Sequence, residues 1–163
     1  MAETLETKDC VVGIDSSTTA TKAIAWTRDG KFVAEGRCPI KLLNPQPGHF
    51  EQNAKDWWTS TAKALQQLTG KIDAHRIASL AISNQRETFC VFDENERPLL
   101  PGTIWLDERA TAQQQAFAEK FGAEAIRGMS GKPVDVIVPL YRMLWIAEHH
   151  PDIYSKIHRF ADV

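Results

Sequence analysis

The sequence predicts an α/β fold with a mixed sheet, an antiparallel hairpin set and flanking helices. Three short strand-like segments come first and are joined by tight turns, which makes consecutive strands antiparallel. One helix then leads into another strand, and a helical crossover of this kind gives a parallel neighbour. The remainder of the 163 residues is mostly helical, and 43% hydrophobic residues are enough for a buried core.

The first three strands are predicted from short apolar runs. Residues 11–14 form a compact apolar run that is too short for a helix, and residues 21–26 form the second strand. Asp29 and Gly30 then predict a hairpin turn, because glycine accepts a positive φ without steric cost. Residues 32–35 follow as the third strand of the antiparallel set.

A helix and two more strands are expected next. After a proline-containing loop at residues 41–50, Asn53 is a suitable N-cap and Gly70 a suitable C-terminal stop for the helix. Residues 77–82 are almost all apolar, which favours a strand in a covered sheet. Residues 88–92 predict a further strand.

The second half of the chain is predicted to be helical. Helices are expected at residues 108–120, 123–127 and 140–149, and residues 157–163 look like the start of a new strand. Apolar residues recur at helical spacing in the last helix and predict its buried stripe. They are Leu140, Met143, Leu144 and Ala147.

Composition excludes several classes of protein. Nineteen Lys and Arg against 21 Asp and Glu give a net charge of −2, without the basic excess typical of a general nucleic-acid binder. No apolar run approaches the roughly 20 residues of a membrane helix, and the acidic N-terminus does not resemble a secretory leader. The odd number of cysteines argues against a disulfide framework, so a reduced, cytoplasmic protein is expected.

The first polar segment, residues 13–22, places Asp15 at the end of a buried strand and Lys22 on the next one. Between them lie small and hydroxyl residues, which let backbone N–H groups approach an anion closely. Asp15 could hold a magnesium ion through water, since this ion keeps most of its hydration. The alternative is an ordinary polar hairpin with Asp15 as a turn-former.

The second and third polar segments could bind a polyhydroxylated ligand. Arg86 offers a planar fork of donors, and Glu87 accepts hydrogen bonds from hydroxyls. The alternative is a solvated connection with a weak surface ion pair. Trp105 could stack on a sugar and Asp107 could take a hydroxyl. Alternatively Trp105 belongs to the core, and Asp107 caps the next helix, which is the favoured role for Asp107 taken alone.

In this order and spacing, the three segments resemble the N-terminal domain of the FGGY carbohydrate kinases, the family of glycerol kinase and xylulokinase. The resemblance spans residues 11–163 and includes residues 47–52 (Pro-Gly-His-Phe-Glu-Gln) as well as Leu144 and Trp145. It implies an actin-like ATPase (ribonuclease H-like) fold and transfer of the γ-phosphoryl group of ATP, with Mg²⁺, to a primary hydroxyl of a sugar or polyol.

The resemblance also assigns site residues. Asp15 matches the family's metal-associated aspartate. The phosphate-contacting hairpin matches Thr18, Thr19 and Lys22, the acceptor-binding segment matches Gln85, Arg86 and Glu87, and Trp105 and Asp107 lie beside it. Many members carry glycine where Ser17 stands, so the turn is expected to form without glycine's freedom.

Departures from the family pattern bear on the substrate. The glycerol-binding branch has Trp-Gln at the place of Trp105 and Leu106, and a tyrosine near Ile137, so glycerol is disfavoured. Kinases similar to xylulokinase often carry a different pair at Arg86 and Glu87. The expected substrate is therefore a sugar or polyol, with a ketopentose or a four- to five-carbon polyol slightly favoured.

The expected organisation is a polar leader at residues 1–9 and a truncated N-terminal, sugar-binding kinase domain at residues 10–163, with the C-terminal domain absent. Because the family's catalytic base is expected beyond Val163, no catalytic residue is assigned here, and the isolated chain is predicted to be inactive. Expected partners are a small-molecule sugar or polyol and the missing domain; nucleic acid and membrane are not expected, and homo-oligomers stay open. The alternatives are another actin-like phosphotransferase or ATPase lobe, or a non-catalytic sugar-binding module.

Overall fold

The computed structural model describes residues 8–163, so the expected polar leader lies almost wholly outside the described residues. Its contacts divide the chain into two compact units. The first unit contains Met1–Lys41 and Lys55–Gln85, and the second contains Leu42–Ala54 and Arg86–Val163. Each unit is described by itself below.

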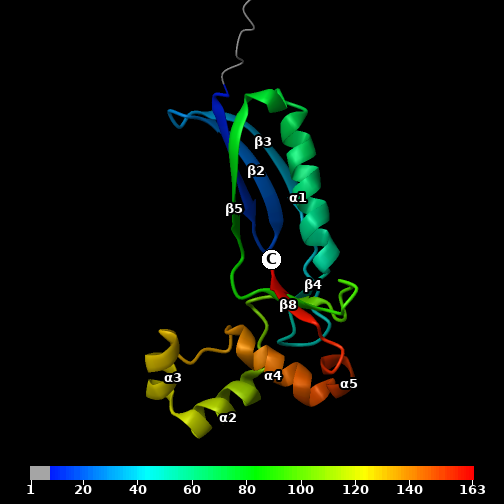
Figure 1. Cartoon of the computed structure of the whole chain (residues 1–163), viewed down its shortest axis with the longest axis vertical. Coiled ribbons are helices and arrows are strands. Elements are labelled where there is room, and N and C mark those ends of the chain that lie inside the picture. The colour runs from blue at the N-terminus through cyan, green and yellow to red at the C-terminus, as the bar shows by residue number, and fades with distance from the viewer. Residues whose placement is uncertain (1–7) are drawn as a thin grey trace, which may run out of the picture. The chain divides into compact units, whose positions relative to one another are not determined.

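The first unit is built on a four-stranded mixed sheet (Figure 1). Its strands are β1 (Cys10–Ser16), β2 (Ala20–Thr27), β3 (Phe32–Pro39) and β5 (Ile77–Asn84), with helix α1 (Ala54–Thr69) and the short 3₁₀ helix η1 (Ala74–Arg76) before β5. The sheet order is β3-β2-β1-β5, with β1 antiparallel to β2 and parallel to β5. The predicted hairpin set and its parallel neighbour are confirmed.

Helix α1 packs on the sheet to make the core of the first unit. Side chains alternate between the two faces of a strand, and those on one face of β1 to β3 meet one stripe of α1. The buried cluster consists of Val12, Ile14, Ala23, Ala25, Ala34, Ala64 and Leu68. The prevalence of alanine brings the helix close to the sheet.

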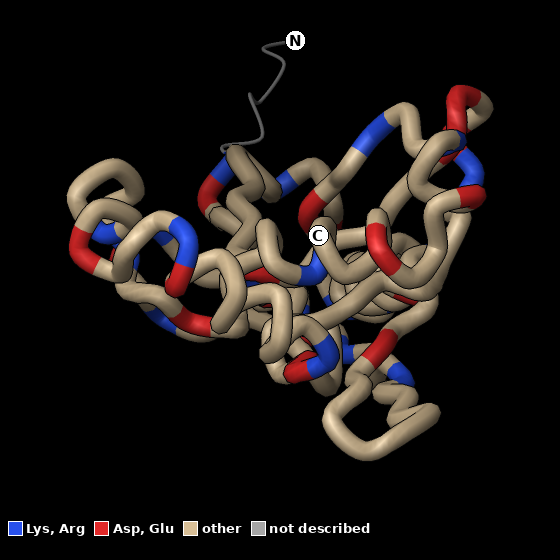
Figure 2. The backbone as a smooth tube through the Cα atoms, turned by 90° about the horizontal axis from the view of Figure 1, so that it is seen from below, with Lys and Arg blue, Asp and Glu red and all other residues tan. Residues whose placement is uncertain are grey.

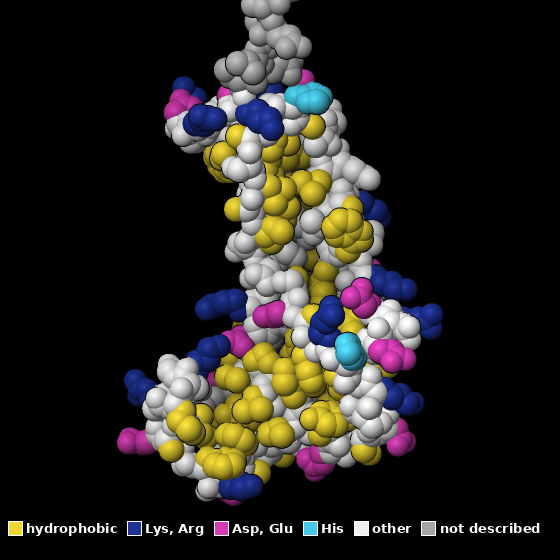
Figure 3. Space-filling model, in the orientation of Figure 1, with side chains coloured by type: hydrophobic (Ala, Val, Ile, Leu, Met, Phe, Trp, Pro, Cys, Tyr) yellow, Lys and Arg dark blue, Asp and Glu magenta, His cyan; other side chains and the backbone are white. Residues whose placement is uncertain are grey.

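Strand β5 is correctly predicted as a strand, but the prediction that it is covered is wrong. The sheet order puts β5 at an edge, and Leu80 and Ile82 are 48% and 64% exposed. Figure 3 shows hydrophobic side chains at the surface over this strand. Only Ile77 of β5 packs against the core cluster. A run of apolar residues therefore predicts that a strand is present, but it does not predict whether other elements pack over that strand.

The second unit has a sheet of its own, which the sequence did not predict as a separate sheet. Its order is β4-β7-β6-β8, and every pair in it is antiparallel. The strands are β4 (Glu51–Gln52), β6 (Phe89–Phe92), β7 (Gly102–Thr103) and β8 (Arg159–Asp162). The strands predicted near residues 88–92 and 157–163 are present, whereas β4 and β7 have two residues each and are too short to show a pattern.

Four helices complete the second unit. They are α2 (Thr111–Phe121), α3 (Ala123–Ser130), α4 (Pro139–His149) and α5 (Pro151–Tyr154). Helix α2 begins three residues later than predicted, but the helical character of this region is confirmed.

The predicted buried stripe of α4 is only partly correct: Met143 packs against a core cluster, but the stripe as a whole does not face the core. The buried residues of this helix are Tyr141, Arg142 and Ile146, whereas Leu140 and Leu144 are exposed. Leu144 instead lines an open groove that α4 shares with α2. Figure 3 shows hydrophobic side chains gathered at the surface over these helices. The buried face of α4 includes the charged residue Arg142. A stripe chosen from apolar residues alone therefore lies on a different side of the helix.

The charges are mixed along the whole described chain. Figure 2 shows basic and acidic residues interspersed along the backbone, consistent with the net charge of −2. Within residues 8–163, no helix has both the length and the apolar character needed to cross a membrane.

Candidate functional site

The hairpin between β1 and β2 brings Asp15 and Lys22 together. They are cross-strand partners, and the Lys22 Nζ lies 3.4 Å from the Asp15 Oδ2, with both side chains partly exposed. The turn closes because the backbone N–H and hydroxyl of Ser17 both donate to the carbonyl of Ala20, at 3.1 and 2.8 Å. No residue of this turn has a positive φ, so it forms without glycine, as expected.

Thr18 and Thr19 occupy the tip of this hairpin. Thr19 is exposed, and its carbonyl accepts a hydrogen bond of 2.9 Å from the backbone N–H of Ile40, which ties the turn to the end of β3. Hydroxyls, backbone N–H groups and the Lys22 ammonium therefore lie at one end of the sheet. This is donor chemistry suited to phosphate oxygens.

The acidic chemistry of the hairpin suits a hydrated cation. Asp15 is a single carboxylate, and among the described residues no group of three or more His, Cys, Asp or Glu side chains is placed to hold a metal ion. Magnesium retains several waters and takes only one or two protein carboxylates. The Asp15 carboxylate therefore has the chemistry to hold a magnesium ion through water.

Gln85 lies at the same end of the sheet as the hairpin, where β1 and β5 finish. These two strands are parallel, with Ser16 beside Asn84. The backbone N–H of Gln85 donates to the carbonyl of Ser16 at 3.0 Å. Ligands of open α/β sheets bind outside the carboxyl ends of the strands. The structure thus brings the predicted phosphate hairpin and the start of the predicted acceptor segment together.

Arg86 and Glu87 begin the longer of the two stretches of chain that form the second unit. Arg86 is exposed, whereas Glu87 is partly buried and forms an ion pair with Lys132. Glu87 has a φ of 59°, in the left-handed region that a residue with a side chain rarely adopts. Such backbone strain persists only where the surroundings hold it, and it gathers at ligand-binding sites.

Trp105 is 41% exposed, so the core alternative for this residue is wrong. Its backbone N–H donates to the hydroxyl of Thr88 at 3.3 Å, which links the segment to the one that carries Glu87. A partly exposed indole can pack on the C–H face of a sugar ring.

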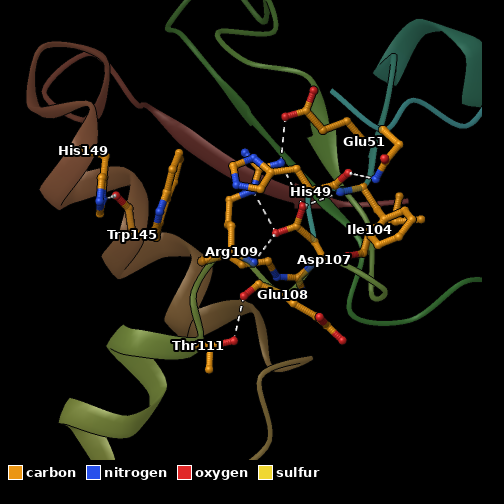
Figure 4. Close-up of polar contacts among 12 residues, drawn as sticks. His49, Glu51, Ile104, Asp107, Glu108, Arg109, Thr111, Trp145 and His149 are labelled. Carbon is orange, nitrogen blue, oxygen red and sulfur yellow. Dashed lines mark hydrogen bonds and ion pairs between the residues drawn. The ribbon is translucent and has the colours of Figure 1, made fainter. Parts of the chain in front are cut away.

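Asp107 is completely buried, at the centre of a network that Figure 4 shows. Its Oδ2 accepts from the backbone N–H of Phe50 at 2.7 Å, and both its oxygens accept from the guanidinium of Arg109 at 2.8 Å. Arg109 also donates to Glu51 at 2.7 Å. Asp107 is not the N-cap of α2, because that position is Ala110, so the capping prediction is wrong.

Arg109 is held as a cation inside the second unit. Burial favours loss of its charge, but hydrogen bonds to Asp107 and Glu51 outweigh burial and raise the pKa of Arg109 above its ordinary value. Its guanidinium lies 5.0 Å from the ring centre of Trp145, on which His149 stacks at 4.6 Å. Figure 4 shows this column of side chains between α4 and the Asp107 segment.

A second buried arginine, Arg142 on α4, donates hydrogen bonds to three backbone carbonyls. It donates to Ile104 at 2.5 Å, to Glu87 at 2.5 Å and to Ile137 at 2.7 Å. Burial lowers the pKa of Arg142 to about 10. Apolar patterning did not predict this buried arginine; the available signal was one basic residue inside an otherwise apolar stretch of helix, because buried charges require partners.

Comparison with known proteins gives one consistent result. The model for the FGGY family of carbohydrate kinases, N-terminal domain, matches residues 10–163. The chain is 30% identical over 152 residues to a glycerol kinase of Leifsonia xyli subsp. xyli, covering 91% of this chain and 30% of that protein. It is 31% identical over 148 residues to a xylulose kinase of Bacillus subtilis, covering 90% of this chain and 30% of that protein. The chain thus spans about 30% of the length of these relatives.

Solved structures agree on the fold. A xylulose kinase from Rhodospirillum rubrum matches with a TM-score of 0.89 at 22% identity, covering 93% of this chain and 32% of that one. A ligand-bound xylulose kinase from Lactobacillus acidophilus matches with a TM-score of 0.87 at 25% identity, covering 93% and 31%. The expected actin-like ATPase fold is confirmed.

Proposed function

The chain belongs to the FGGY family of carbohydrate kinases, and from this premise we propose that it supplies the phosphate- and acceptor-binding domain of an ATP-dependent sugar or polyol kinase. The observation that carries the proposal is that the Asp15–Lys22 hairpin and Gln85 lie side by side at one end of the mixed sheet. A phosphate donor and a hydroxyl acceptor have to meet at one place, and phosphoryl transfer depends mainly on such positioning and on charge neutralisation.

On the donor side, ATP with Mg²⁺, when bound, supplies the γ-phosphoryl group. The Lys22 ammonium and the hydroxyls of Thr18 and Thr19 bind phosphate oxygens, and Asp15 holds the hydration shell of the metal. The pairing of Lys22 with Asp15 keeps the ammonium at the end of the sheet before the nucleotide arrives.

On the acceptor side, we assign the hydroxyls of the sugar or polyol to Gln85, Arg86 and Glu87, and its C–H face to Trp105. Asp107 has no exposed surface, so it acts by holding the segment that carries Trp105. In the transfer, the acceptor oxygen forms a bond to the γ-phosphorus, the bond to ADP breaks, and the hydroxyl proton passes to a base. We place that base in the part of the longer relatives that this chain does not match.

The acceptor class follows from two positions near the proposed site. Leu106 and Ile137 stand where the resemblance to the glycerol-binding branch implies a glutamine and a nearby tyrosine, which disfavours glycerol as the acceptor. A ketopentose or a four- to five-carbon polyol is the acceptor we propose. Such a kinase uses ATP, and we therefore place the protein in the cytoplasm.

The proposal is tested with the protein produced from its whole natural reading frame. ADP release is measured with a panel of ketopentoses, tetritols, pentitols, glycerol and gluconate, and sustained release is expected with one of the five-carbon or four-carbon acceptors. Asp15→Asn is expected to lower kcat by about a hundredfold, because it removes the charge that holds the hydrated metal beside the transferring group.

The matched control is Asp29→Asn. Asp29 is also a hairpin carboxylate paired with a lysine, Lys31, but it lies in the β2–β3 turn. We expect its rate to equal that of the wild type. ATP hydrolysis that is independent of any acceptor would contradict the proposal in favour of an ATPase lobe. Acceptor binding without turnover would favour a non-catalytic module.

The 163 residues on their own are expected to release no ADP in a sustained, sugar-dependent manner, because the proposed base lies outside them. The measurement is the same coupled assay on the purified chain, with the whole reading frame as the positive control. Sustained turnover by the short chain would contradict this placement of the base.

A further inference from the structure

We propose that Arg142 is a positioning residue for the acceptor, which fixes the backbone that carries Glu87 and Trp105. This inference rests on the proposed function and deepens it. The supporting geometry lies entirely within the second unit, where one guanidinium joins the carbonyls of Glu87, Ile104 and Ile137.

Arg142 differs from the other buried arginine of this unit. Arg109 neutralises two carboxylates, as a structural ion pair does, whereas within residues 8–163 no carboxylate forms an ion pair with Arg142. Burying a charge without such a partner is costly unless hydrogen bonds satisfy it. Arg142 makes three hydrogen bonds to carbonyls, and its guanidinium lies 5.3 Å from the ring centre of Phe89. The planar guanidinium can join several acceptors at once in fixed directions.

The first of these carbonyls belongs to a strained residue. Glu87 has a left-handed backbone, which costs free energy for any residue with a side chain. The hydrogen bond from Arg142 to the Glu87 carbonyl holds this conformation. Because the Cα–Cβ bond leaves the backbone in a fixed direction, the hydrogen bond also sets where the Glu87 side chain starts, and the ion pair with Lys132 holds its carboxylate.

The second carbonyl, of Ile104, belongs to the peptide group that precedes Trp105. The Ile104 carbonyl and the Trp105 N–H belong to one planar peptide group. Arg142 binds the carbonyl side of this group, and the Thr88 hydroxyl binds its N–H side. With both sides bound, the peptide plane is fixed, and with it the starting direction of the Trp105 side chain.

The third carbonyl, of Ile137, ties these two segments to the chain that enters α4. Ile137 is one of the two positions, with Leu106, at which the sequence departs from the glycerol-binding pattern. Arg142 therefore joins the two segments that carry Glu87 and Trp105 to the start of α4, and it does so from a helix, where its own backbone is rigid. Pre-organisation of this kind lowers the entropy cost of binding.

The test uses Arg142→Lys and Arg142→Gln in the protein produced from its whole reading frame. Hydrogen bonds to a charged donor are strong, so the KM for the acceptor is expected to rise about tenfold or more in Arg142→Gln, while the KM for ATP changes by less than about twofold. Arg142→Lys keeps the charge and three donors but not the planar fork. Its KM for the acceptor is therefore expected to lie between the values of Arg142→Gln and the wild type. Arg159→Lys, at an exposed position on β8, is the control and is expected to match the wild type.

A purely structural role would lower thermal stability and the fraction of folded enzyme while leaving both KM values unchanged, and this result would overturn the proposal. If Arg142→Gln does not fold, the KM split in Arg142→Lys decides. If the wild type phosphorylates no acceptor of the panel, the proposed function fails. The positioning role is then decided by the NMR signals of the Glu87 amide and the Trp105 indole, which have to shift in Arg142→Lys and to stay unchanged in Arg159→Lys.

Discussion

Asp107→Ala is expected to lower the free energy of unfolding by about 4 kcal/mol, because it removes one partner of a buried ion pair. Arg109, which is 7% exposed in its side chain, would keep only Glu51 as a counter-charge. The backbone N–H of Phe50 would lose its acceptor inside the protein, which adds the cost of an unsatisfied donor. Urea denaturation of the 163-residue chain measures the loss.

A double-mutant cycle separates the free energy of the Asp107–Arg109 ion pair from that of the other contacts in the network. Asp107→Ala combined with Arg109→Met is expected to recover part of the loss, since an apolar side chain of similar length does not leave a buried charge without its partner. Asp152→Ala, at an exposed position in α5, is the control and is expected to change stability by less than about 0.5 kcal/mol. A loss of less than about 1 kcal/mol for Asp107→Ala would contradict the network of Figure 4.

The parts of the fold that the sequence predicted well are those with local signals. The turn at Asp29 and Gly30, the apolar runs of the first strands and the helix between Asn53 and Gly70 each depend on neighbouring residues. The two-residue strands β4 and β7 depend on distant partners instead, with Glu51 opposite Thr103. Two residues are too few to show an alternating pattern, and no local pattern specifies such a pairing.

The same distinction applies to the candidate site. Asp15 and Lys22 flank one short turn, so their pairing across the hairpin follows from the predicted strands. The burial of Asp107 depends on Phe50, which is 57 residues away in the sequence. Arg142 was missed for a different reason, because an arginine is normally assigned to the solvent face of a helix.

Gly36→Ala is expected to lower the free energy of unfolding by about 3 kcal/mol, because there is no room for a methyl group at this position. Gly36 lies on β3, facing α1, and an added Cβ would be 1.9 Å from the carbonyl oxygen of Ala64 and 2.8 Å from the backbone nitrogen of Leu68. Both are backbone atoms of the helix, so no side-chain rotation can relieve the overlap. The helix and the strand would have to separate.

Gly13→Ala is the matched control, because Gly13 is also a strand glycine of the same sheet and its added Cβ meets nothing within 4 Å. Alanine at this position is expected to leave stability unchanged or to raise it slightly, since it restricts the unfolded chain. The contrast tests the packing of α1 on β3, on which the core of the first unit depends. If Gly36→Ala were as stable as Gly13→Ala, α1 could not lie as close to the sheet as described. The buried hydrogen bond of 2.8 Å between Thr21 on β2 and Ser60 on α1, which needs the same close approach, would then also be contradicted.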